Sequence, residues 1–69
     1  MTKAQIASIK KEIEKLTANL EKATAKRNRT LEIIKEDSSW KMFLEEDTER
    51  VKYYERHIDR LIAMIEGAA

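Results

Sequence analysis

The chain has 69 residues, with 14 basic side chains, 13 acidic side chains and a formal net charge of +1. It contains one glycine and neither cysteine nor proline. This length allows one small domain. The lack of cysteine excludes disulfides and thiolate metal sites, and the scarcity of turn residues argues against a turn-rich β fold. Because no apolar run approaches the roughly 18 residues of a membrane span, we expect a cytoplasmic protein without membrane contact.

The first half of the chain has the spacing of an amphipathic helix. Its apolar residues recur at alternating intervals of three and four, as in the seam of a coiled coil: Ile6, Ile9, Ile13, Leu16, Leu20 and Ala23. Thr2, followed three residues later by Gln5, fits a capping box. The pattern predicts a helix over about 3–36.

The second half repeats the pattern in steps of seven. The recurring residues are Leu44, Val51, Ile58 and Ile65, accompanied by Trp40, Tyr54 and Leu61. Gly67 follows the last periodic residue and is a plausible stop signal. We therefore predict a second helix over about 39–66.

Local chemistry favours a turn between the halves over one continuous rod. Poor helix formers and good N-cap residues meet at Asp37, Ser38 and Ser39. Folding the chain back at about 37–39 pairs apolar residue with apolar residue along two antiparallel seams, for example Leu16 with Ile58. We predict an all-α fold, a two-helix antiparallel coiled-coil hairpin. A break in the first helix near 24–30 is a weaker alternative.

One layer of the predicted hairpin is polar on both sides. It sets Arg27 opposite Asp47, which we interpret as a half-buried ion pair that fixes register and orientation at some cost in stability. The alternative is that Arg27 binds a carboxylate or phosphate. Lys26 and Arg50 are expected to lie across the same edge of the seam, where they leave a cationic spot.

Charge is distributed unevenly between the halves. Residues 1–35 hold nine basic and four acidic side chains, whereas residues 36–69 hold five basic and nine acidic ones. Pairing of the two halves is the simpler interpretation. The alternative is a nucleic-acid-binding helical bundle that uses the basic face of the first helix, which carries no aromatic residue to stack on bases. Its candidate residues are Lys22, Lys26, Arg27 and Arg29.

A two-helix seam gives a thin core, so apolar residues outside the seam are informative. They favour a second contact surface, and the simplest is dimerisation into a four-helix bundle. Tyr, Trp, Phe and Met are enriched at interfaces and often carry most of the binding energy. The predicted partner-binding residues are Ile33, Trp40, Met42, Phe43 and Tyr53.

No residue pattern suggests catalysis or a cofactor. His57 is the only histidine and cannot form a zinc site by local spacing. Carboxylates need an enclosed cleft for acid–base work, which a two-helix rod lacks. The sequence therefore predicts a small non-enzymatic interaction module, an adaptor, inhibitor or assembly factor that docks on another protein. The partner, and the choice between a dimer and a higher oligomer, stay open.

Overall fold

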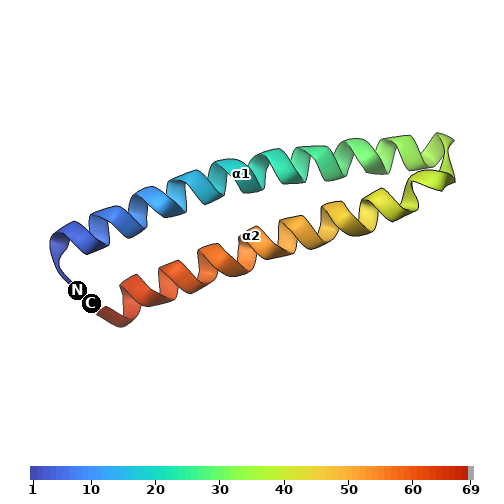
Figure 1. Ribbon diagram of the computed structural model, residues 1–69. Coiled ribbons are helices and arrows are strands. Elements are labelled where there is room, and N and C mark those ends of the chain that lie inside the picture. Colours follow the sequence, from blue (N-terminus) through green and yellow to red (C-terminus); the bar gives the residue numbers. More distant parts are fainter. Residues whose placement is uncertain (69) are drawn as a thin grey trace.

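The computed structural model describes residues 1–68 as two long helices packed side by side (Figure 1). Helix α1 runs over Lys3–Glu36 and helix α2 over Lys41–Ala68, with a short 3-10 helix, η1, at Ser38–Trp40 between them. Both chain ends lie at the end of the rod opposite the turn, so the helices are antiparallel. The predicted all-α hairpin is confirmed.

Helix α1 begins and ends where its capping residues predict. Gln5 donates its backbone N–H to Thr2 Oγ1 at 3.1 Å, and Thr2 donates its own to Gln5 Oε1 at 2.9 Å. These bonds satisfy N–H groups that a helix start otherwise leaves without partners. At the far end Asp37 adopts an extended conformation and ends the helix. No break occurs near residues 24–30, because α1 is continuous through them.

The turn is built around the Asp37 side chain. Its Oδ1 accepts the backbone N–H of Ser39 at 3.1 Å and the Ser39 hydroxyl at 2.7 Å. The hydroxyl bond, followed by the backbone bond, holds the pKa of Asp37 below its ordinary value because both favour the ionised form. This carboxylate caps η1, which leads directly into α2.

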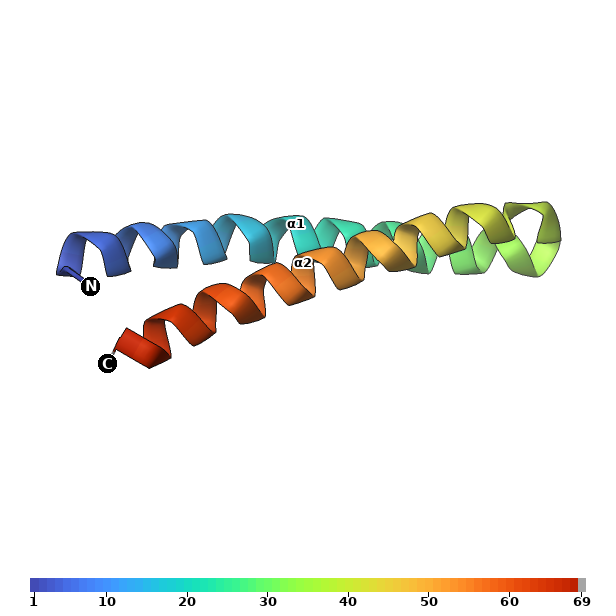
Figure 2. The ribbon, with the colours of Figure 1, turned by 60° about the horizontal axis from the view of Figure 1, so that its bottom comes forward.

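The core lies along the predicted seams. The most buried apolar residues are Leu16, Ala23 and Val51, with Thr30 and Asp47 as buried polar neighbours. The remaining predicted seam isoleucines are half-buried, because two helices cannot enclose a side chain on every side. Figure 2 shows the helices crossing at a shallow angle. The rod measures 51 × 16 × 11 Å.

The structure corrects two predicted boundaries. Helix α2 begins at Lys41, after η1, and continues to Ala68, past the predicted end at residue 66. Gly67 does not act as a stop because its φ is not positive, the left-handed conformation that a glycine C-cap adopts. In residues 1–68 no helix is long and apolar enough to cross a membrane.

Candidate functional site

A buried polar cluster joins the two helices. Asp47 is only 3% exposed, and its Oδ2 accepts the Thr30 hydroxyl at 2.6 Å. Its other oxygen lies 3.4 Å from Lys26 Nζ, which reaches in from the exposed edge of α1. Thr30 itself is 4% exposed, and its hydroxyl also lies 3.1 Å from the Lys26 carbonyl oxygen. The carboxylate is therefore held by one neutral and one charged donor.

The predicted ion pair between Arg27 and Asp47 is wrong. Successive helix residues are about 100° apart, so Lys26 and Arg27 stand on opposite edges of the seam. Asp47 lies on the Lys26 edge and takes Lys26 and Thr30 as partners. Arg27 is half-buried, and its Nε is enclosed without a hydrogen-bond partner among residues 1–68. The spacing of Lys26 and Thr30, one helical turn apart on the same edge, was the signal for the true partners.

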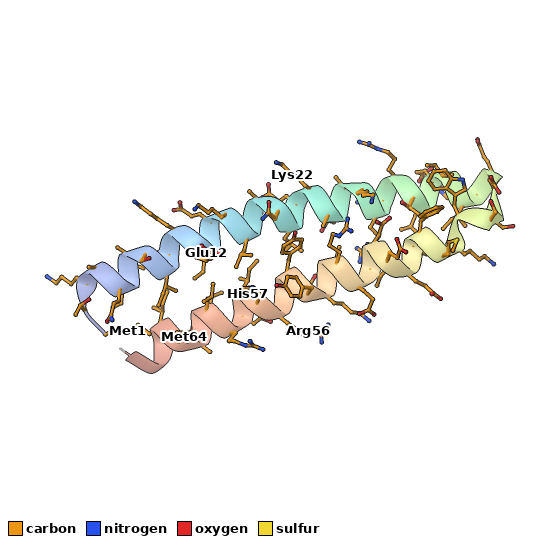
Figure 3. All side chains as sticks on the ribbon, viewed as in Figure 1. Met1, Glu12, Lys22, Arg56, His57 and Met64 are labelled. Carbon is orange, nitrogen blue, oxygen red and sulfur yellow. The ribbon has the colours of Figure 1, made fainter. Side chains whose placement is uncertain are left out.

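The predicted cationic spot is confirmed as an open groove. It has a volume of about 220 Å³ and is lined by Asn19, Lys22, Ala23, Lys26, Arg50 and Tyr54. Lys22 contributes to its wall, although in the view of Figure 3 the side chain stands on the side of α1 away from α2. Arg29 is exposed and does not line this groove. The four basic candidates for nucleic acid therefore do not share one surface, since Arg27 points into the seam.

The turn end carries an aromatic pair. The Trp40 and Phe43 rings lie 4.9 Å apart between centroids at an interplanar angle of 49°, and both are exposed. Met42 beside them is 63% exposed, whereas Ile33 of α1 is half-buried. These side chains form the surface that we call the turn-end cluster, namely Ile33, Trp40, Met42 and Phe43.

Tyr53 does not belong to the turn-end cluster. It lies ten residues beyond Phe43, or about 15 Å along α2 at a rise of about 1.5 Å per residue. Its ring packs edge-on against Tyr54 at 5.6 Å and against His57 at 6.0 Å. The five predicted partner-binding residues are therefore divided between two places on the hairpin, and Tyr53 is the 59% exposed member of a second aromatic group.

The remaining surface offers little chemistry for catalysis. Within residues 1–68 no group of three or more histidine or acidic side chains is arranged to hold a metal ion. Figure 3 shows Met1 and Met64 at the open end of the rod and Arg56 on the outer side of α2. Comparison of the chain with family models, with curated protein sequences and with solved structures found no match.

Proposed function

We propose that this chain is a small, non-catalytic protein–protein interaction module that associates with itself and docks through the turn-end cluster. The observation that carries the proposal is the imbalance between core and surface. Three apolar residues are buried, whereas eight large apolar side chains are exposed along the rod. Scattered exposed apolar residues are ordinary, but adjoining ones on a small protein are typical of interaction sites.

The total surface supports the same proposal. The hairpin exposes 5444 Å². A compact monomer of 8.1 kDa is expected to expose about 4500 Å². The excess of about 900 Å² is close to the roughly 800 Å² that each partner buries in a standard protein interface. Association would bring the exposed surface back to the range of compact proteins.

Trp40 and Phe43 are the best candidates for anchors at the turn end. Large aromatic side chains bury much area at low conformational cost and dominate binding energy at many interfaces. Each ring already rests on the other, so part of its freedom is lost before a partner arrives. Closure of the hairpin end is a second use of the same residues, and only a binding measurement separates the two.

The test is analytical ultracentrifugation over a wide concentration range. The unmodified chain should sediment as more than a monomer, and Trp40→Ala should raise its dissociation constant about tenfold or more, the effect of losing an interface anchor. Ile62→Ala is the matched control, because Ile62 is an apolar residue of similar exposure remote from the turn. A stable, strictly monomeric chain would refute self-association, and unchanged association of Trp40→Ala would reduce the turn-end cluster to hairpin closure.

The nucleic-acid alternative is supported by one observation. Tyr54 of α2 lines the same groove as Lys22, Lys26 and Arg50, and so supplies the aromatic side chain that α1 lacks. Phosphate contacts release counterions, so nucleic-acid binding should weaken steeply as salt is raised. Salt-sensitive binding to single-stranded nucleic acid that is lost on Lys26→Gln would favour this alternative over the interaction module.

A further inference from the structure

Helix α2 carries a second stripe of three-four spacing beside its core seam. Each member precedes a core residue by one position, so the stripe is turned about 100° around the helix from the core. All its members are exposed except the half-buried His57. We call it the outer stripe, and its residues are Phe43, Glu46, Arg50, Tyr53, His57 and Arg60.

The centre of the outer stripe is an open groove ready to receive a side chain. It has a volume of about 690 Å³ and is lined by Glu45, Glu46, Glu49, Arg50, Tyr53 and Tyr54. The contacts of Tyr53 with Tyr54 and His57 restrict its ring, which remains 59% exposed. In residues 1–68 the ion pairs are Lys26–Asp47 and Lys35–Glu32, so Glu46 and Arg50 have no ionic partner within the chain.

The order of residues along the outer stripe is self-complementary. When the stripe is laid antiparallel on a copy of itself, about a point midway between Glu46 and Arg50, Glu46 faces Arg50 of the second copy and Arg50 faces its Glu46. The same register sets Phe43 against Tyr53 of the second copy, and the reverse. A twofold axis requires this reciprocity, since each contact in such an interface occurs twice.

Competing registers are electrostatically poorer. A parallel arrangement sets Glu46 against Glu46 and Arg50 against Arg50, which is repulsive at both positions. Sliding the antiparallel copy by two heptads sets Arg50 against Arg60 of the second copy. Sliding it by one heptad sets Phe43 against Arg60. Only the register centred between Glu46 and Arg50 joins opposite charges and stacks aromatic rings in the same interface.

We propose that the outer stripe is the homodimer face, and that two hairpins pack antiparallel with α2 against α2. The proposal rests on the self-association proposed above and names its surface, orientation and register. The four contacts are two aromatic pairs and two ion pairs, which set the orientation and exclude like-charge alignments. The excess surface of the hairpin is of the size that one such face buries.

The decisive experiment mixes two charge-reversed variants. Glu46→Arg alone sets two basic side chains opposite each other at both ends of the contact, and Arg50→Glu alone does the same with acidic ones. Each variant by itself should dissociate at a concentration at least about tenfold higher than the unmodified chain. An equimolar mixture of the two should associate again, because every reversed side chain then meets its opposite. Sedimentation equilibrium measures all three samples.

Two control variants separate this face from a general effect of charge and from a contact between α1 and α2 of different copies. Asp59→Arg applies the charge change of Glu46→Arg to an exposed position outside the stripe and should leave association unchanged. Lys22→Glu should leave association unchanged or strengthen it, because an α2–α2 contact places the basic edges of the two α1 helices on the same side. If acidic α2 docked on basic α1 instead, Lys22→Glu would weaken association. Circular dichroism confirms that each variant remains helical.

The outcomes distinguish this proposal from the proposed function. If the unmodified chain associates but both charge-reversed variants associate equally well, the outer stripe is not the interface although self-association stands. Failure of the mixture to restore association would also overturn the antiparallel register. If the unmodified chain is monomeric at every concentration, both proposals fail together.

Discussion

Asp47 shows how one buried carboxylate is made tolerable in a thin core. Its charge is partly neutralised by Lys26, whose exposed ammonium group remains hydrated, and one oxygen accepts the Thr30 hydroxyl. Removing a charged group from water is costly unless hydrogen bonds replace the lost hydration. The cluster therefore adds little net stability, but it penalises any alignment of the helices that separates these three residues.

Thr30→Val tests the dependence of Asp47 on the threonine hydroxyl. Valine keeps the shape of threonine and removes the donor, which leaves a carboxylate that is 3% exposed with Lys26 as its one partner. We expect a loss of about 1–3 kcal/mol in the free energy of unfolding, measured by urea denaturation. Thr17→Val is the control, because Thr17 donates to a backbone carbonyl at an exposed position. Equal losses in the two variants would contradict a special role for Thr30.

Replacement of both Arg27 and Asp47 by leucine should have the opposite effect. The double variant removes a buried carboxylate and an enclosed Nε that lacks a partner, and it adds apolar surface at the seam. Replacing buried charged groups by apolar residues of similar size is often neutral or stabilising by about 1–4 kcal/mol. The unfolding midpoint in urea should therefore stay or rise. A large loss of stability would show that the polar cluster stabilises the hairpin.

At the scale of the helices, the sequence predicted where α1 runs but not the details that depend on rotation about a helix axis. Thr2, Gln5 and Asp37 determine the ends of α1 by local hydrogen bonds, which spacing in the sequence reveals. The partner of Asp47 depends on which edge of the seam it occupies, and neighbouring positions differ by about 100°. For the same reason, the separation of Tyr53 from the turn-end cluster was visible only in the folded hairpin.

The turn should be sensitive to acid through Asp37. Its pKa is lower in the folded hairpin than in the unfolded chain, so the ionised form contributes stability at neutral pH. That contribution is complete above the ordinary pKa of an aspartate and is lost as the pH falls through the lowered value. Asp37→Asn keeps an acceptor oxygen for Ser39 and does not titrate. The difference in thermal midpoint between the two proteins should therefore shrink in acid; a difference constant with pH would contradict this assignment.

The final turn of α2 should gain helix content from Gly67→Ala. Gly67 is helical, its φ is not positive, and a Cβ at this position would meet nothing within 4 Å. Alanine is favoured over glycine in a helix by up to about 1 kcal/mol, and less near a fraying end. Circular dichroism should show a small rise in helicity without a change in association. A fall in helicity would mean that Gly67 ends the helix in solution.

For the whole molecule, stability and association should prove inseparable. A rod with three buried apolar residues has little core of its own, and a second copy that binds only the folded hairpin would stabilise it by mass action. The free energy of unfolding per dimer should rise by about 1.4 kcal/mol for each tenfold increase in chain concentration. Urea denaturation followed by circular dichroism at several concentrations measures this dependence directly. Glu46→Arg should flatten it without abolishing the fold, whereas an unmodified chain whose midpoint ignores concentration would have to draw its stability from the two-helix core alone.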